Sequence, residues 1–478
     1  MMQTLKQQWF GNIRADILSG IVVALALIPE AIAFSIIAGV DPMVGLYTSF
    51  IIAVVISFAG GRPGMISAAT GAMALLMVPL VRDYGLDYLL AATILTGIIQ
   101  LIFGICKVAK VMKFVPNAVM IGFVNALAIL IFMAQLEHFI GISTMTYLFV
   151  GITLILLYTL PRFIKVIPAP LIAIVALTSI AIFSGVNLNT VGDLGTITQT
   201  LPSFFIPNVP WTFETLQIIF PYALSMAIVG LLETLLTSQI VDDMTGTESN
   251  KNGEARGQGM ANFITGFFGG MAGCAMIGQS VINVKSGGRG RLSTFIAGIF
   301  LMFLIIVLGD LVVQIPMPVL VGIMIMVSIG TFDWSSFNYL IKAPRTDAIV
   351  MLTTVIIVVY THDLSKGVLA GVLLSAIFFV IKISNVKISK DGNRYSIHGQ
   401  LFFASIDGFV DYFKKADIQS EKIQIDFSDS RVWDDSGVGA ILKVSELLKS
   451  KGIQVELVEL DSSSKKIMDK LNGVLSSH

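Results

Sequence analysis

Residues 67–81 read SAATGAMALLMVPLV, a small polar run that leads directly into an apolar half-helix too short to span a bilayer. Residues 274–284, CAMIGQSVINV, repeat the pattern in the second half of the chain. A helix N-terminus carries a positive partial charge, and two interrupted segments can aim their N-termini at one site near the bilayer midplane. The pair therefore predicts a transporter whose substrate is an anion.

The composition is that of a membrane protein. Of 478 residues, 55% are hydrophobic and 13% are charged, and the mean hydropathy is +0.85. Apolar runs able to cross about 30 Å of hydrocarbon predict a polytopic α-helical fold with about fourteen membrane segments, several of them short or interrupted. The predicted segments are 15–38, 43–60, 66–81, 88–106, 114–136, 145–161, 168–186, 216–241, 258–274, 278–284 and onward, 292–315, 318–332, 346–361 and 365–383.

The positively charged residues predict the orientation, because Lys and Arg stay in cytoplasmic loops. With the N-terminus inside, only Arg82 and Lys366 fall outside, and the connection 187–215 contains no Lys or Arg. We expect this connection to be an external loop between halves of about 12–186 and 216–386, with both chain ends cytoplasmic. The residues assigned to the cytoplasmic side are Arg62, Lys107, Lys110, Lys113, Arg162, Lys165, Lys251, Arg256, Lys285, Arg289, Arg291, Lys342, Arg345, Lys382 and Lys387.

The chain changes character near Lys387, after which Lys, Asp and Ser become frequent. We expect a membrane domain over 1–386 and a soluble domain over 387–478. The run 436–452 predicts an amphipathic helix that ends at Gly452, and together with several strands it makes a small α/β domain. The strands are predicted within 386–392, 395–405, 422–428 and 453–460.

Neither catalytic chemistry nor a metal site is indicated. No nucleophile elbow, phosphate loop or catalytic pair stands out, and the histidines are scattered along the chain. Cys106 and Cys274 are isolated in or beside apolar segments, which favours small core residues over a disulfide or a zinc site. We therefore expect no enzyme, no metal or other cofactor, and no nucleic-acid partner.

The candidate anion site combines the starts of the two half-helices. Moving an unpaired anion into hydrocarbon is prohibitive, whereas opposed helix N-termini offer partial positive charge and free N–H groups. The Thr70 hydroxyl and the Gln279 amide can add donors, and the small neighbours let the backbone approach. The alternative is that these small residues only pack crossing helices. The candidate residues are Ala69, Thr70 and Gly71 in the first segment and Gly278, Gln279 and Ser280 in the second.

Two acidic residues lie deep in apolar segments, where a carboxylate is costly and usually marks an ion or proton path. Glu30 lies in the first predicted segment and Glu233 in the first segment of the second half, so their places are comparable. Either could carry a proton or bind a cation alongside the anion. The alternative is a carboxylate that only hydrogen-bonds between helices.

Several motifs now identify a family. Residues 28–50, IPEAIAFSIIAGVDPMVGLYTSF, resemble the signature of the sulfate permease family, the bacterial relatives of the solute carrier 26 anion transporters. Residues 67–73, 235–270 and 282–293 resemble the family's third-helix motif, its eighth and ninth helices and the segment after its tenth-helix turn. Residues 425–441, IDFSDSRVWDDSGVGAI, resemble a STAS domain, which is similar to bacterial anti-sigma factor antagonists. The resemblance covers nearly the whole chain.

The resemblance implies an inverted repeat of seven plus seven helices, divided into a core domain that holds the substrate and a gate domain. Family members commonly form homodimers and move the core past the gate in an elevator-like shift. Carried over by position, the anion site comprises the six candidate residues above, with Phe34 as an aromatic wall. Glu233 matches an acidic position that contributes to cation coupling in some relatives.

Three departures from the family pattern bear on coupling. Some relatives have Arg where Gln279 stands, so the anion field here is expected to come mainly from helix ends. Sodium-coupled bicarbonate carriers have Asp where Glu233 stands, so sodium coupling does not transfer directly. Glu30 replaces a frequent Gln, which favours proton coupling because a mobile carboxyl could neutralise an incoming anion.

In the soluble domain, the run 434–437, DDSG, aligns with the loop that is phosphorylated on serine in anti-sigma factor antagonists. Phosphorylation of Ser436 would add negative charge at a helix N-terminus and could switch the binding of a cytosolic regulator. The alternative is that Ser436 only caps the helix that begins there.

These patterns favour a proton-coupled symporter of the plasma membrane that carries sulfate, with bicarbonate next and dicarboxylates as a further alternative. A nucleobase permease shares the architecture but would lack the STAS domain. An anion channel of the same fold remains an alternative, as does a membrane-anchored signalling protein that acts through its STAS domain.

Overall fold

The computed structural model describes residues 5–110, 115–164 and 168–475. Lys113 and Lys165, two residues of the orientation argument, lie outside these ranges, as does the first residue of the segment predicted over 114–136. The chain divides into two compact units, Met1–Val372 and Leu373–His478, which are described separately.

The first unit is helical. Its apolar runs form helices because a continuous helix satisfies every backbone polar group without water. The helices of the first half are α1 (Leu5–Phe10), α2 (Ile13–Ala38), α3 (Pro42–Ala59), α4 (Gly71–Tyr84), α5 (Leu86–Ile105), α6 (Asn117–Leu136), α7 (Thr144–Phe163) and α8 (Ala169–Ser184). Those of the second half are α9 (Phe213–Thr245), α10 (Lys251–Phe267), α11 (Ile277–Lys285), α12 (Arg291–Val312), α13 (Met317–Thr331), α14 (Ser336–Lys342), α15 (Arg345–Thr361) and α16 (Leu364–Ile383).

Each predicted membrane segment overlaps a helix, and a polytopic helical fold is confirmed. Among the described residues, nine helices are long and apolar enough to cross a membrane, so the number of fourteen crossings stays a prediction. The bounds predicted over 258–274 are wrong at both ends, because α10 begins at Lys251 and ends at Phe267. Its first turn is polar, capped by the Asn250 side chain, and apolarity alone could not find it.

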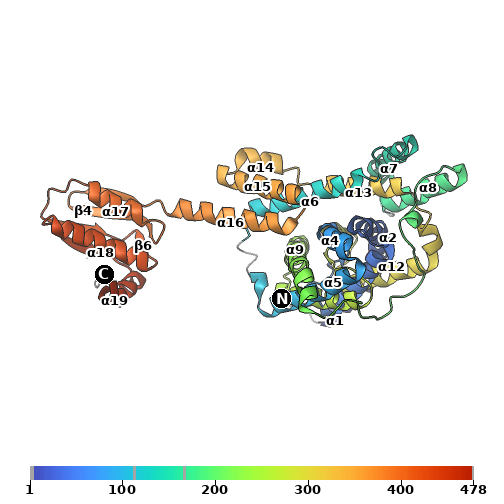
Figure 1. Cartoon of the computed structure of the whole chain (residues 1–478), viewed down its shortest axis with the longest axis horizontal. Helices are drawn as coiled ribbons and strands as arrows, with labels where there is room; N and C mark the ends of the chain where they lie inside the picture. The colour runs from blue at the N-terminus through green and yellow to red at the C-terminus, as the bar shows by residue number, and fades with distance from the viewer. Residues whose placement is uncertain (1–4, 111–114, 165–167, 476–478) are drawn as a thin grey trace. The chain divides into compact units, whose positions relative to one another are not determined.

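Within the first unit the helices pack in two groups (Figure 1). In one group, α10 lies against α5 and α3, α12 against α2 and α3, and α9 against α4, α5 and α11. In the other, α13 packs on α6, α7 and α8, and α15 packs on α6. The groups meet where α13 and α8 contact α2 and where α6 contacts α4. The half-helix α4 therefore lies at the boundary between the two groups.

Glycines permit the closest helix pair of the first group. A Cβ added at Gly97 of α5 would be 2.3 Å from the backbone nitrogen of Phe263 in α10. A Cβ added at Gly259 would be 2.6 Å from the backbone nitrogen of Leu101. Small residues let membrane helices approach in this way, so α5 and α10 pack closely against each other.

The second unit is an α/β domain. Strands β3 (Lys387–Asp391), β4 (Arg394–Leu401), β5 (Lys422–Asp426) and β7 (Gln454–Val458) form a sheet in that order, and β6 (Ser430–Val432) pairs with β4. The pairs β4–β5 and β5–β7 are parallel, and β3–β4 is antiparallel. The helices are α17 (Ile406–Lys415), α18 (Asp435–Ser450) and α19 (Ser462–Leu475).

The predicted strands and the helix before Gly452 are confirmed in this domain. Gly452 has a φ of +80°, which suits a residue that follows a helix end. The helices α17 and α19 and the strand β6 were not predicted from the sequence. Phe409 and Phe413 of α17 are fully buried against Tyr395 and Phe427, so this missed helix supplies much of the domain core.

Candidate functional site

A short two-stranded sheet brings the starts of the two half-helices together. β1 (Ser67–Ala68) precedes α4, β2 (Cys274–Ala275) precedes α11, and the two strands pair antiparallel. The Met276 N–H extends the pairing by donating to the Ile66 carbonyl at 2.8 Å. Segments that are far apart in the sequence therefore present their helix starts side by side.

Two further features hold the strands at this distance. An added Cβ at Gly273 would be 2.2 Å from the Ala68 carbonyl oxygen, so only glycine allows the approach. The Ser280 hydroxyl accepts the Ile66 N–H at 2.9 Å and lies 3.4 Å from the Ile66 carbonyl oxygen. The structure thus directs Ser280 to the backbone of the neighbouring segment, where it helps to position the two helix starts.

The start of α4 is capped by Thr70. Its hydroxyl oxygen accepts the Met73 N–H at 3.4 Å and lies 3.1 Å from the Cys274 sulfur and 3.5 Å from Glu233 Oε2. The Thr70 side chain is buried at 2% exposure. Thr70 therefore connects the first half-helix to β2 and to the acidic residue of α9.

Glu233 and Cys274 form a buried pair. The Cys274 thiol donates to Glu233 Oε2 at 2.9 Å, and Glu233 is 7% exposed. Cys274 is the buried residue that the sequence predicts, and it also contacts the carboxylate, which the sequence analysis missed. Its place directly before the second half-helix was the available signal. The interpretation of Cys106 as a core residue is wrong, because Cys106 is exposed at the end of α5.

The start of α11 is more open. Met276 precedes the helix and makes no side-chain cap, so the first N–H groups have no capping partner there. Gly278 is exposed, and a Cβ added to it would meet nothing within 4 Å. Gln279 is 2% exposed, and its Nε2 donates to Glu30 Oε1 of α2 at 2.9 Å. The second acidic candidate therefore lies beside the second half-helix.

Phe34 lies against the first half-helix. A Cβ added at Gly71 would be 2.9 Å from Phe34 Cε1 and 3.0 Å from Ile131 Cδ1. Ile131 belongs to α6 of the other helix group, and the sequence analysis missed it because nothing local marks it. The start of α4 is thus enclosed by one side chain from each group.

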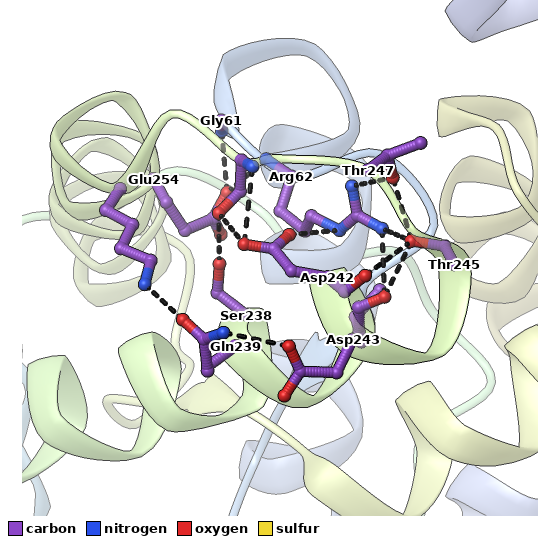
Figure 2. A network of polar contacts seen from close by, with 12 residues as sticks. Gly61, Arg62, Ser238, Gln239, Asp242, Asp243, Thr245, Thr247 and Glu254 are labelled. Atoms are coloured by element: carbon purple, nitrogen blue, oxygen red, sulfur yellow. Dashed lines mark hydrogen bonds and ion pairs between the residues drawn. The ribbon is translucent and has the colours of Figure 1, made fainter.

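A second polar network fixes the segment that leads into β1 (Figure 2). Arg62 forms an ion pair with Asp242 of α9 at 3.3 Å and donates to the Thr247 hydroxyl at 2.8 Å. Glu254 of α10 accepts the backbone N–H groups of Gly61 and Arg62 at 2.6 and 2.8 Å. Buried backbone groups need such partners, so this network holds the approach to the first half-helix between α9 and α10.

In the α/β domain, Asp434 and not Ser436 caps α18. Asp434 Oδ1 accepts the Gly437 N–H at 2.9 Å, and its Oδ2 accepts the Phe403 N–H at 2.8 Å. Ser436 is the second residue of the helix, and its N–H is bound by Asp435 Oδ1. The capping interpretation of Ser436 is therefore wrong, since an adjacent carboxylate takes that position.

Comparisons with known proteins identify the family. The Sulfate permease family pattern matches residues 13–354, and the STAS domain pattern matches residues 385–473. The chain is 62% identical over 474 residues to YbaR of Bacillus subtilis (strain 168), which is named as a candidate sulfate transporter; the match covers 98% of this chain and 99% of YbaR.

Two solved structures are similar to the structure of this chain. The transmembrane domain of a cyanobacterial bicarbonate transporter, BicA, matches with a TM-score of 0.67 and 26% identity, over 76% of this chain and 98% of that one. The murine anion transporter Slc26a9 in its inward-facing state matches with a TM-score of 0.84 over 97% of this chain and 88% of that one. At 18% identity, the second likeness shows the fold alone.

The resemblance inferred from the sequence motifs is thereby confirmed. The family pattern spans most of the helical unit, and the STAS pattern spans the α/β domain. The expected membrane transporter fold and the absence of an enzyme class follow from this membership. The chain belongs to the sulfate permease family and is a multi-pass membrane transporter of small anions with a STAS domain.

Proposed function

We propose that the chain is a secondary active transporter of small inorganic anions, with sulfate as the first candidate, that holds the anion between the starts of α4 and α11. The β1–β2 pairing carries this proposal, because it lays the two helix starts side by side. Each start offers roughly half a positive charge and N–H groups without intrahelical acceptors. Such a site binds an anion without a fixed Arg, so the anion can also leave.

The proposed binding residues follow from these positions. Thr70 shapes the first helix start, Gln279 supplies an amide at the second, and Phe34 walls the site. Ser280 acts through the strand pair, because its hydroxyl is bound to Ile66. The remaining contacts are assigned to the backbones of Gly71 and Gly278. Ala69 is buried and its N–H donates to the Ser49 hydroxyl at 3.3 Å, so Ala69 is proposed to position the start of α4.

The carboxylates support coupling to protons. Glu30 contacts Gln279 at one helix start, and Glu233 contacts Thr70 at the other. A proton on either carboxyl removes a negative charge beside the incoming anion, so anion and proton would enter together. Sodium is the alternative coupling ion.

The two helix groups support an elevator-like mechanism. The candidate site lies on the first group, while Ile131 of the second group borders it. Sliding of the first group past the second would expose the site to either side of the membrane in turn. We assign the first group to the core domain and the second to the gate, and we propose that the transporter works as a homodimer.

We further propose that the protein resides in the plasma membrane with both ends in the cytoplasm. The transport domain would occupy residues 1–386 and the regulatory STAS domain residues 387–478. Ser436 lies at the start of α18, partly exposed, where a phosphate would alter the binding of a cytosolic regulator.

Bicarbonate is the second candidate substrate, favoured by the likeness to the transmembrane domain of BicA. Sulfate and bicarbonate share negative charge and oxygen acceptors, so helix starts serve both. Dicarboxylates are the third candidate. A channel of the same fold and a signalling role through the STAS domain are the remaining alternatives.

Uptake of labelled sulfate, bicarbonate and fumarate into proteoliposomes tests the proposal. Each anion is offered with an inward proton gradient, with an inward sodium gradient and with neither. We expect sulfate uptake driven by protons and lost in Glu233→Gln. The matched control is Glu137→Gln, which changes the same charge on a side chain that is 78% exposed. Absence of gradient-driven uptake for every anion would overturn the proposal in favour of a channel or a signalling role.

A further inference from the structure

The amide of Gln279 has one bound atom and one orphan atom. Its Nε2 donates to Glu30 Oε1 at 2.9 Å. Its Oε1 is buried and, within the described ranges, has no hydrogen-bond partner. Buried polar atoms nearly always have partners, so an orphan oxygen at a candidate binding site points to a second arrangement of the amide.

Gln279 and Glu30 differ in exposure. Gln279 is 2% exposed, whereas Glu30 is only partly buried and the neighbouring Gly278 is exposed. Glu30 is therefore the more exposed member of the pair, and the amide that it binds is shielded. Protonation of Glu30 can thus control the orientation of the Gln279 amide.

No described ionisable group other than Glu30 competes for the amide. Glu233 of α9 is bound by Cys274 and Thr70. The helices packed against α2 carry other charged and titratable residues, but none of these forms a hydrogen bond or ion pair with Glu30 in the described part of the chain. They are Tyr47 on α3, Arg82, Asp83 and Tyr84 on α4, Lys285 on α11, and Arg291 and Asp310 on α12, together with Arg14 and Asp16 on α2 itself.

We propose that Glu30 and Gln279 form a proton-controlled amide switch that sets whether the start of α11 attracts or repels an anion. The inference rests on the proposed anion transport. When Glu30 is ionised it accepts the amide N–H, and the amide presents its oxygen to the rest of the site. An oxygen atom repels an anion, so the site is closed to substrate electrostatically.

Protonation of Glu30 reverses the hydrogen bond. The new carboxylic O–H donates to Gln279 Oε1, which gives the orphan oxygen its partner. The amide turns by half a rotation about its last side-chain bond and releases its N–H groups toward the anion. One O–H bond forms as a proton is taken up from solution, and the pair loses its negative charge. Loss of the proton restores the first arrangement and expels the anion.

Equilibrium binding of labelled sulfate to the purified full-length chain in detergent tests the switch. Sulfate keeps its charge from about pH 5 to about pH 9, a range that spans perturbed carboxyl pKa values. If the uptake assay identifies bicarbonate as the substrate, the binding assay uses bicarbonate in place of sulfate, with the concentration of the bicarbonate ion held constant at every pH. We expect the affinity of the wild type for sulfate to fall by about tenfold or more as the pH rises across this range. This is the effect of reversing one charge-assisted hydrogen bond.

Substitution of either residue should remove the pH dependence of sulfate affinity, but with opposite effects on the affinity itself. Glu30→Gln cannot ionise and can donate to the Gln279 oxygen, so it should bind tightly at every pH. Gln279→Met keeps the side-chain length without a donor and should bind weakly at every pH. Glu137→Gln should follow the wild-type profile. In weakly buffered solution, wild-type protein should also take up a proton as sulfate binds, whereas Glu30→Gln should not.

The outcomes separate this inference from the proposed function. Wild-type binding without pH dependence or proton uptake overturns the switch and leaves anion binding in place. The switch is also overturned if a folded Glu30→Gln or Gln279→Met variant keeps the wild-type dependence of sulfate affinity on pH. Failure of the wild type to bind or transport any of the tested anions overturns the proposed function and the switch with it. Should a variant fail to fold, the proton-uptake measurement on the wild type decides.

Discussion

Gly273→Ala tests whether the strand pair assembles the site. The added Cβ would be 2.2 Å from the Ala68 carbonyl oxygen and 2.9 Å from the carbonyl carbon. Close carbon–oxygen contacts between strands lie near about 3.3 Å, so the two strands must separate by about 1 Å. The nearest obstructing atom belongs to the backbone, which cannot rotate away as the Ile52 side chain at 2.7 Å can. The helix start that follows β2 would therefore move away from α4 by a similar distance.

The expected effect is larger on transport than on folding. Overpacking of this kind costs about 1–3 kcal/mol of unfolding free energy. A misplacement of about 1 Å in a preorganised site can cost on the order of 10²-fold in rate. We therefore expect a folded variant with a moderately lowered unfolding temperature and with sulfate uptake close to background.

The assay compares initial uptake into proteoliposomes with thermal unfolding of the same preparation. Gly151→Ala in α7 is the matched control, because a Cβ there would meet nothing within 4 Å. The control should gain about 0.5–1 kcal/mol, as expected for Ala in place of Gly in a helix interior. Uptake by Gly273→Ala equal to that of the control would refute the reasoning, because the strand spacing would then not matter to the site.

Other substitutions test the helix caps and the buried polar network described above. Thr70→Val removes the oxygen that caps α4 and should lower sulfate uptake by about tenfold or more, whereas Thr70→Ser should retain uptake; equal loss in both would contradict the capping role. Glu254 Oε2 accepts both N–H groups, so Glu254→Gln replaces a charged acceptor with a neutral amide oxygen and should lower the free energy of unfolding by about 1 kcal/mol, measured by thermal unfolding; unchanged stability would argue against this network. Asp434→Ala should weaken the first turn of α18 by about 1 kcal/mol and speed amide exchange there, whereas Ser436→Ala should leave exchange unchanged; the reverse order would make Ser436 the cap. Hydrogen bonds from the serine hydroxyl and amide groups that follow it hold the pKa of Asp461 below its ordinary value. This carboxylate therefore stabilises the start of α19 above the pKa of the unfolded chain, and the stabilisation is lost as pH falls through the lower folded pKa. The protection of the α19 amides from exchange, taken relative to the intrinsic exchange rate at each pH, should fall in acid, and Asp461→Asn should remove that dependence.

Hydrophobicity alone predicts most of the helical unit. Every predicted segment overlaps a helix, because a long apolar run in a membrane has few alternatives to a helix. The errors fall where polar residues open a helix, as in α10, whose first turn contains Glu254. That carboxylate is buried because a loop nearly two hundred residues away uses it, and no local pattern contains this information.

The candidate site was predictable as two helix starts but not as a set of contacts. The interrupted segments around Thr70 and Gln279 mark the places where helices begin. The contact between Gln279 and Glu30 joins residues 249 positions apart, and the contact between Cys274 and Glu233 joins residues 41 apart. Such contacts depend on the packing of α2, α9 and α11, which a single sequence does not specify.

The two half-helices are unequal, and their inequality bears on how the site can release its anion. At α4 the Thr70 oxygen already caps the helix and faces Glu233 and a thiol, so little donor capacity remains in that side chain. At α11 the first turn is uncapped, Gly278 is open, and the Gln279 amide can present either a donor or an acceptor. The adjustable part of the electrostatic field on the anion therefore lies at α11. The neutral Gln279 amide can turn its donor away and release the anion, which a permanently charged Arg would not allow.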